Sequence, residues 1–191
     1  MDDGELRIVY ETHDGVQELV DCVRYTLEAI SLEFDRWDEQ HVKGPGMYLA
    51  VVTGPSIASF ADPMGRNRWP TNRCRDVCLD LDAFFETARD VAVTRDGAVV
   101  VSVDGVVQEQ MVRFTDLMPD ERDDLDPRDA DYEGWMGSRH MSALDTSRRP
   151  NVVTTLTLSE ETGRVSLFEA GAMETLERPE LGGEWNTDGD A

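Results

Sequence analysis

The sequence predicts an α/β fold, a single domain in which a central mixed β-sheet is flanked by helices. Helix-type and strand-type hydrophobic patterns alternate along the 191 residues, and 40% of the residues are hydrophobic, enough for one sizeable core. No repeat of solenoid or propeller period is visible. Interleaved helices and strands of this kind are typical of a sheet with helices packed on it.

The first half of the chain contains two helical patterns and one strand pattern. Residues 16–34 carry apolar side chains at three- and four-residue spacings, which predicts an amphipathic helix. The Gly-Pro-Gly stretch at 41–46 breaks the chain, and the apolar run at 47–52 predicts a buried strand. We expect a loop at 62–75, which is rich in Pro, Gly, Asn and Arg, and a second helix at 77–88.

The second half is richer in short β-branched runs, several of them separated by Asp-Gly turns. These runs predict strands at 91–93, 98–103, 106–107, 111–114, 152–158 and 165–168. A helix is expected at 135–144, and residues 159–164 fit a hairpin loop. The polar, proline-containing stretch 116–134 predicts an excursion with a short helix at most.

The charge composition is strongly acidic. The chain has 40 Asp and Glu residues against 18 Lys and Arg, a net charge of −22, and Lys43 is its only lysine. Such a surface predicts a halophilic protein, because molar salt screens the repulsion between carboxylates. A disordered acidic chain is the alternative, and the apolar strand-like runs argue against it.

The same composition limits the partners and the compartment. A field of this sign repels nucleic acid and anionic lipid, so we expect neither as a partner. No stretch approaches the length of a membrane-spanning helix and the first residues lack a signal-peptide pattern, which predicts a cytoplasmic protein. The three cysteines fit a reducing compartment. Cys74 and Cys78 could share a helix face, as buried small residues rather than metal ligands.

Three polar islands stand between apolar runs, at 96–98, 137–140 and 159–163. Each has an ordinary structural explanation: an Asp-Gly turn, a loop ending in a helix N-cap, and a hairpin loop. Together they supply a metal-binding acid, an Arg-His pair behind a Gly-Ser turn, and a Ser-Glu pair, which is what a nucleoside triphosphate site needs. No P-loop, dinucleotide-binding glycine motif or nucleophile elbow is present.

The order and the amino-acid sequence of these islands resemble those of the diadenylate cyclase domain, whose members condense two ATP molecules into cyclic di-AMP. The family's Asp-Gly-Ala motif matches 96–98. Its Gly-Thr-Arg-His-Arg-x-Ala-Ala-Leu segment matches 137–144, which is one position shorter, and its Val-Ser-Glu-Glu-Thr-Gly-x-Ile-Ser segment matches 158–166. The resemblance covers roughly residues 47–171. It implies a catalytic domain at 46–175. The helical pattern predicts a separate N-terminal helical segment at 1–45, which matches nothing in the family, and the composition predicts a flexible acidic tail at 176–191.

The resemblance also implies roles for individual residues. The catalytic residues would be Asp96, Arg139 and His140, with Asp96 binding Mn²⁺ or Mg²⁺ and the Arg-His pair neutralising charge on the phosphates. The residues expected to contact ATP are Gly97, Ala98, Arg113, Gly137, Ser138, Ser159 and Glu160. Glu161 is expected at the metal beside Asp96. Because each domain would hold one ATP, catalysis implies a homodimer or a higher homo-oligomer.

Some positions depart from the family pattern. Arg95 stands in place of a His, Ser138 in place of Thr, and Met141 in place of the second Arg of Arg-His-Arg. The loss of that guanidinium leaves Arg95, Arg113, Arg148 and Arg149 as candidates to replace it. The substitution also keeps open an alternative function, a catalytically inactive module of the same fold that senses ATP or cyclic di-AMP. A structural or interaction domain with chance motifs is the remaining alternative.

Overall fold

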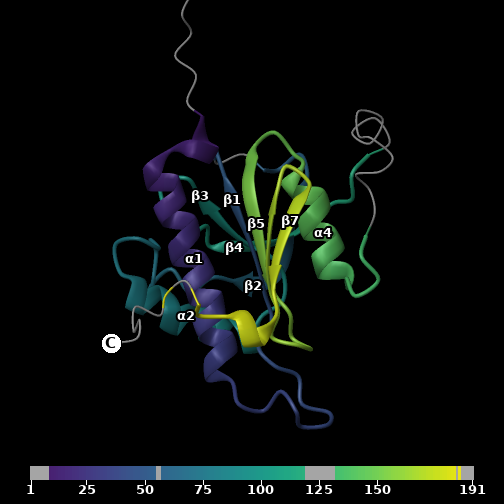
Figure 1. Cartoon of the computed structure of the whole chain (residues 1–191). Helices are drawn as coiled ribbons and strands as arrows, with labels where there is room; N and C mark the ends of the chain where they lie inside the picture. The colour runs from purple at the N-terminus through teal and green to yellow at the C-terminus, as the bar shows by residue number, and fades with distance from the viewer. Residues whose placement is uncertain (1–8, 55–56, 119–131, 184, 186–191) are drawn as a thin grey trace, which may run out of the picture.

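A five-stranded mixed sheet forms the centre of the protein, with the strand order β3-β1-β5-β6-β7 (Figure 1). The structure is a computed structural model that describes residues 9–54, 57–118, 132–183 and 185. The strands of the sheet are β1 (Met47–Val52), β3 (Val99–Ser102), β5 (Val152–Leu158), β6 (Val165–Glu169) and β7 (Ala172–Leu176). Strands β1 and β3 are parallel and the other neighbours are antiparallel, which confirms the mixed sheet predicted from the sequence.

Helices cover both faces of this sheet. Helix α1 (Asp14–Glu33) and helix α2 (Leu81–Thr94) pack on one face, whereas α4 (Ser138–Ser147) packs on the other (Figure 1). A two-stranded sheet is formed by β2 (Ala61–Arg68) and β4 (Gln110–Phe114); Val112 and Phe114 of β4 pack in the core beneath α4, whereas Met111 packs in the core beneath α1. Two short 3₁₀ turns, at Tyr10–Thr12 and Arg178–Glu180, complete the described elements.

Strand β1 shows why both faces need a cover. All six of its residues are buried. Because successive side chains point to opposite faces of a strand, Leu49 and Val51 pack in the hydrophobic core beneath α1, while Tyr48, Ala50 and Val52 pack in the core beneath α4. A strand that is apolar on both faces is stable only between two layers, and helices α1 and α4 supply them.

Several segments differ from the prediction. Residues 106–107, expected as a strand, form isolated β-bridges, and α4 begins at Ser138 rather than at residue 135. Two further segments change type. Residues 62–75, expected as a loop, contain most of β2, whose extended form comes from its antiparallel pairing with β4 and includes a register shift between Pro63 and Arg68. Residues 91–93, expected as a strand, form the last turn of α2, because Phe84, Ala88 and Val91 lie on one buried face of that helix. The tertiary partner outweighs the local propensity in both cases.

The boundary of α2 also differs. The helix begins at Leu81 rather than near residue 77, because the Asp80 carboxylate accepts a hydrogen bond from Ala83 N at 2.9 Å and acts as the N-cap. Cys74 and Cys78 therefore precede the helix and do not share one of its faces. Cys74 is buried, whereas Cys78 is exposed.

The segment after β7 packs against α1 in its described part. Leu181 is buried, and the buried Glu28 carboxylate of α1 accepts hydrogen bonds from Gly182 N at 2.8 Å and from Trp185 Nε1 at 3.2 Å. These contacts join residues 181–183 and 185 of the predicted tail to the helix, while 184 and 186–191 lie outside the described residues. Most of the polar excursion, at 119–131, also lies outside them.

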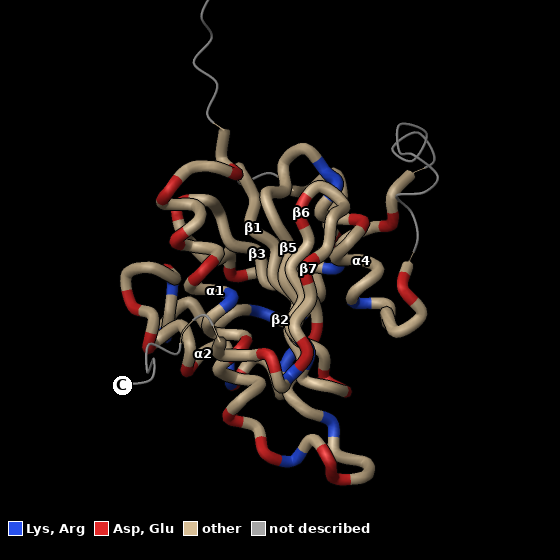
Figure 2. The backbone as a smooth tube through the Cα atoms, in the orientation of Figure 1, with Lys and Arg blue, Asp and Glu red and all other residues tan. Residues whose placement is uncertain are grey.

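Acidic residues are spread over the outer loops and helices, with far fewer basic ones among them (Figure 2). The described residues include no helix with the length and apolar character needed to cross a membrane.

Candidate functional site

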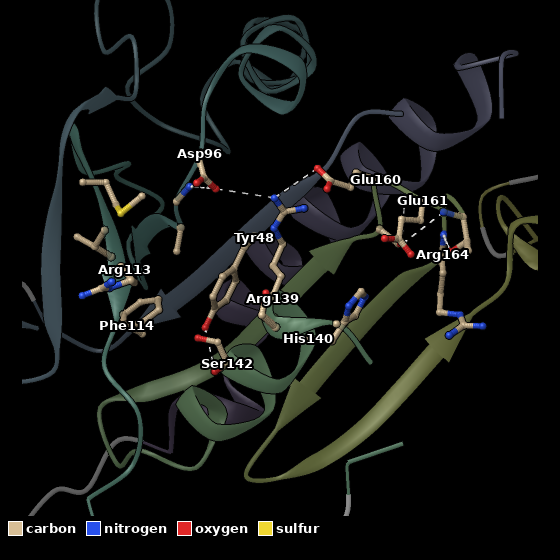
Figure 3. A pocket seen from close by; sticks show the side chains of 18 of the residues that line it. Tyr48, Asp96, Arg113, Phe114, Arg139, His140, Ser142, Glu160, Glu161 and Arg164 are labelled. Atoms are coloured by element: carbon tan, nitrogen blue, oxygen red, sulfur yellow. Dashed lines mark hydrogen bonds and ion pairs between the residues drawn. The ribbon is translucent and has the colours of Figure 1, made fainter. Parts of the chain in front are cut away.

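A cavity of about 680 Å³ opens on the α4 side of the sheet (Figure 3). Its walls come from the turn before β3, from β4, from the start of α4 and from the turn between β5 and β6. The cavity is lined by every site residue proposed from the sequence: Asp96, Gly97, Ala98, Arg113, Gly137, Ser138, Arg139, His140, Ser159, Glu160 and Glu161. The fold thus brings the three polar islands to one place.

The turn at 96–98 needs a glycine at its centre. Gly97 has a φ of +104°, and a Cβ atom there would lie 3.2 Å from the carbonyl oxygen of Val112. Ala98 and Val112 exchange backbone hydrogen bonds of 2.7 and 3.0 Å, which fix the turn against β4. The Asp96 carboxylate accepts from Gly97 N at 2.8 Å and is 74% exposed at the edge of the cavity.

The N-terminal end of α4 faces the cavity with unsatisfied donors. The first N–H groups of a helix have no partner within it, and the N-cap residue Gly137 has no side chain to accept from them. The first turn also lacks an acidic residue. These N–H groups and the positive end of the helix dipole favour an anion in this position.

Arg139 lies between two carboxylates. Its Nη2 atom is 3.9 Å from Asp96 Oδ1 and 3.8 Å from Glu160 Oε2, and its side chain is 27% exposed (Figure 3). Both distances are those of ion pairs and too long for hydrogen bonds. Within the described part of the chain the guanidinium makes no hydrogen bond, so its donors are available to a ligand.

The turn between β5 and β6 is closed by its own hydrogen bonds. The Ser159 hydroxyl accepts from the backbone N–H groups of Glu161 and Thr162, both at 3.4 Å, and Gly163 N donates to the Ser159 carbonyl at 3.0 Å. Gly163 has a φ of +71°, which favours glycine. The Ser159 oxygen is therefore occupied within the turn, and its hydroxyl proton is the part left for a ligand.

His140 is a neutral residue in this environment. It is only 7% exposed, its Nε2 atom has no hydrogen-bond partner, and its ring packs edge-on against Trp135 with 5.1 Å between centroids. Burial, followed by the positive charges of Arg164 and Arg139, lowers the pKa of His140 to about 4. Without a ligand the imidazole is therefore neutral at pH 7. That His140 neutralises phosphate charge stays a prediction, since a bound polyphosphate would raise its pKa. Its unpartnered nitrogen can still form a hydrogen bond with a ligand.

Four arginines were candidates to replace the guanidinium that is absent at Met141, and the structure shows which of them line the cavity. Arg113 lines the cavity, where its Nη2 atom lies 3.6 Å from Asp62 Oδ2 and its side chain is 73% exposed. The other candidates are absent from the cavity lining: Arg95 caps the end of α2, and Arg148 and Arg149 lie at the far end of α4.

A divalent metal fits one side of this cavity. No group of three His, Cys, Asp or Glu side chains suited to a metal occurs in the described ranges, so Asp96 and Glu161 do not belong to a complete protein site. Asp96 does offer an exposed carboxylate. Mg²⁺ is commonly bound by one or two carboxylates, with substrate phosphates and water as the other ligands. Glu160, rather than Glu161, is the acid that shares Arg139 with Asp96.

Sequence reasoning missed several residues of the lining. The guanidinium of Arg164 stacks on the ring of Trp135, with Cζ 3.9 Å from the ring centroid, and this pair forms one wall of the cavity. Tyr48 donates to the Ser142 carbonyl at 3.2 Å, and burial raises its pKa, so its hydroxyl stays protonated. The available signal for Trp135 was its position, two residues before the Gly137 that opens the second polar island. Tyr48 carried none, because it lies within an apolar run.

Comparison with known proteins gives a fold and no sequence relative. No protein-family profile and no curated protein matches the chain. A crystal structure of DacA from Staphylococcus aureus, a double mutant, is similar with a TM-score of 0.51 and 15% identity, over 85% of this chain and 89% of that one. A hypothetical membrane-spanning protein from Bacillus cereus aligns with a TM-score of 0.49 and 18% identity, over 84% and 64%. The likeness to DacA agrees with the single α/β domain described above.

Proposed function

We propose that the protein is a diadenylate cyclase, which converts two ATP molecules into cyclic di-AMP and two pyrophosphates. The observation that carries the proposal is that one cavity brings together an uncapped helix start, the Arg139 guanidinium, whose hydrogen-bond donors are unused among the described residues, and the exposed Asp96 carboxylate. The fold is like that of DacA, a diadenylate cyclase, which supports this choice among triphosphate chemistries.

The chemistry needs two nucleotides in opposed positions. The 3′-oxygen of each ATP attacks the α-phosphorus of the other and forms a new P–O bond. The bond from that phosphorus to the bridging oxygen of the β-phosphate breaks, pyrophosphate leaves, and the hydroxyl proton passes to water. A cavity of about 680 Å³ suits one nucleotide rather than two. We therefore propose that two copies of the chain face each other, in a homodimer or a higher homo-oligomer.

The described residues provide binding and orientation for this reaction. The N–H groups at the start of α4, near Gly137 and Ser138, and the Arg139 guanidinium would hold phosphate oxygens. The turn at 96–98 would let ribose and phosphate approach the backbone, since Gly97 has no side chain. Mn²⁺ or Mg²⁺ at Asp96, when bound, would offset phosphate charge and lower the pKa of the attacking hydroxyl. Alignment of two bound reactants can contribute ~7–11 kcal/mol to the rate.

A nucleotide-sensing module is the second candidate. Met141 lies in α4, one residue after His140, where the resembled family has a second arginine. The cavity also contains four acidic residues, Asp96, Asp116, Glu160 and Glu161, against three arginines. A site with this balance can bind a nucleotide without the extra cation that would stabilise the leaving pyrophosphate.

The deciding experiment incubates the protein with ATP and Mn²⁺ in molar salt and measures cyclic di-AMP by mass spectrometry. We expect product from the wild type, none from Asp96→Asn, and wild-type amounts from Asp104→Asn, a matched change in the Asp-Gly turn outside the cavity. Specific activity should rise with protein concentration until the dimer forms. ATP binding without product would favour the sensing module, and neither binding nor product would contradict both functions.

A further inference from the structure

The loop that precedes β1, residues 43–46, lies against two residues of the cavity although it is distant from them in sequence. Lys43 Nζ is 2.9 Å from Glu160 Oε1, and Gly44 N donates to the Glu160 carbonyl at 2.8 Å. A Cβ atom on Gly46 would lie 2.5 Å from Arg139 Nη1 and 2.8 Å from Glu160 Cβ. The loop therefore touches the Glu160 side chain and the Arg139 guanidinium at the same time.

Glu160 faces two cations and is bound to one of them. Its Oε1 atom accepts a hydrogen bond from Lys43, whereas its Oε2 atom is 3.8 Å from Arg139 Nη2, beyond hydrogen-bond distance (Figure 3 shows the Arg139 side of this arrangement). The cluster of Lys43, Glu160, Arg139 and Asp96 has no net charge. Without Lys43 it would be net negative, and Glu160 would have Arg139 as its nearest cation.

The ion pair between Lys43 and Glu160 contributes little to the stability of the fold, because the Lys43 side chain is 79% exposed. Seventeen of the eighteen basic residues are arginine, so the single lysine stands in a chain that otherwise uses guanidinium. A lysine binds one carboxylate oxygen as a point charge, whereas an arginine fork can take both oxygens. In the structure Lys43 binds Oε1 of Glu160. An arginine could hold the same carboxylate, so the positive charge at position 43 is what the cluster requires.

We propose that loop 43–46 is a positioning element of the cavity: Lys43 holds Glu160 and Gly46 leaves space for Arg139, so that the Arg139 guanidinium stays free for the polyphosphate of a nucleoside triphosphate. The inference rests on the proposed function for the class of ligand. Lys43 acts through Glu160 and Arg139 and needs no contact with the ligand.

The test compares Lys43→Ala with Arg89→Ala, a matched loss of an exposed cation whose partners, Glu33 and Glu86, lie on α1 and α2. Binding of ATP with Mn²⁺ is measured by isothermal titration calorimetry. Lys43→Ala should raise Kd about fivefold, the size expected for an exposed charge pair, and Lys43→Arg should stay within about twofold. Arg89→Ala should leave Kd unchanged. A wild-type Kd for Lys43→Ala would overturn the inference.

A second background separates positioning from direct contact. In Glu160→Gln the carboxylate that would capture Arg139 is gone, so adding Lys43→Ala should change Kd no further. An undiminished fivefold loss in that background would mean that Lys43 touches the ligand, and would overturn the positioning role. Gly46→Ala should also raise Kd, because its Cβ displaces the Arg139 guanidinium, and its melting temperature shows whether the fold persists.

Inorganic triphosphate, titrated in the same way, keeps this inference distinct from the proposed function. A wild type that binds triphosphate and ATP with the Lys43 effect, but forms no cyclic di-AMP, removes the cyclase proposal and supports the positioning role. Formation of cyclic di-AMP, with a wild-type Kd for Lys43→Ala, supports the cyclase proposal and removes the positioning role. A wild type that binds neither probe contradicts both.

Discussion

The two ends of α4 use the same residue types in opposite ways. At the N-terminal end, Arg139 makes no hydrogen bond to a described residue and the Nε2 atom of His140 has no partner. At the C-terminal end, Arg149 is 6% exposed, donates to the Thr115 carbonyl at 2.9 Å and lies over the ring of Phe60, 4.6 Å from its centroid. The guanidinium at one end is part of the fold, and the guanidinium at the other is available to a ligand.

The difference comes from what each end of the helix meets. The chain that follows β4 and the ring of Phe60 cover the C-terminal end, and they supply carbonyl oxygens and an aromatic face. Around the N-terminal end, the described neighbours of Arg139 and His140 come from the turns at 96–98 and 159–164, from loop 43–46 and from Trp135, with the cavity between them. An arginine therefore serves structure or binding according to its neighbours, and sequence spacing alone could not rank Arg139, Arg148 and Arg149.

The largest expected effect is on activity, at the open end. Arg139→Ala should lower kcat/KM for cyclic di-AMP formation by about 10²–10³, the usual cost of a missing donor to a developing charge. Its melting temperature should change by no more than about 2–4 °C, because ion pairs of 3.8 and 3.9 Å contribute little. Steady-state kinetics and thermal unfolding of the same sample check both statements. A large loss of stability would show that the open end belongs to the fold.

The next effect is on stability, at the closed end. Arg149→Ala leaves the Thr115 carbonyl without this donor and removes the contact with Phe60, which should lower the free energy of unfolding by about 2–3 kcal/mol. For a chain of this length that corresponds to about 4–12 °C in Tm. ATP affinity measured below the new Tm should stay as in the wild type. An unchanged Tm would contradict the structural role of Arg149.

The fold was predictable where the pattern is local and strong. The runs at 47–52 and 152–158 are apolar or β-branched throughout, and both are fully buried strands. Strand β2 could not be predicted, because Asp62, Pro63 and Gly65 favour turns and only the pairing with β4 extends them. The prediction of a strand at 91–93 was wrong, because it followed the β-branched composition of these residues rather than the helical spacing that they continue from Phe84.

The candidate site was predictable as a set of motifs and less so as a geometry. The islands at 96–98, 137–140 and 159–163 do line one cavity. The neutral state of His140 depends on burial against Trp135 and on the nearby Arg164, which no spacing reveals. The contacts of Lys43 with Glu160 and of Gly46 with Arg139 join segments far apart in the chain, and only the folded arrangement brings them together.

A third prediction uses the pKa of His140, lowered to about 4 by burial and by Arg164 and Arg139. In the unfolded chain the His140 side chain is protonated below about pH 6.5, whereas in the folded chain it is protonated only below about pH 4. The free energy of unfolding should therefore fall as the pH drops from 6.5 to 4. At pH 5 the loss should be about 1–2 kcal/mol relative to His140→Gln, which lacks this group. Denaturant unfolding of both proteins at pH 7.5 and 5 measures it. Parallel losses would mean that His140 titrates normally.

The smallest effect is expected in the middle of α4. Tyr48→Phe removes the 3.2 Å hydrogen bond to the Ser142 carbonyl while the ring stays buried, so the free energy of unfolding should fall by about 1 kcal/mol. ATP binding should change less than twofold, because the hydroxyl is directed at the backbone of α4 (Figure 3). Chemical denaturation and calorimetry test this. A large loss of binding with little loss of stability would move the ligand site towards the middle of the helix.

The central claim is that the open end of α4 binds the triphosphate of a nucleotide, and a crystal structure with a non-hydrolysable ATP analogue and Mn²⁺ tests it most directly. The account predicts phosphate oxygens within hydrogen-bond distance of the backbone N–H groups of residues 138–140 and of the Arg139 guanidinium, with the metal at Asp96. A triphosphate bound elsewhere, with Arg139 still between Asp96 and Glu160 and in contact with no ligand, would contradict it.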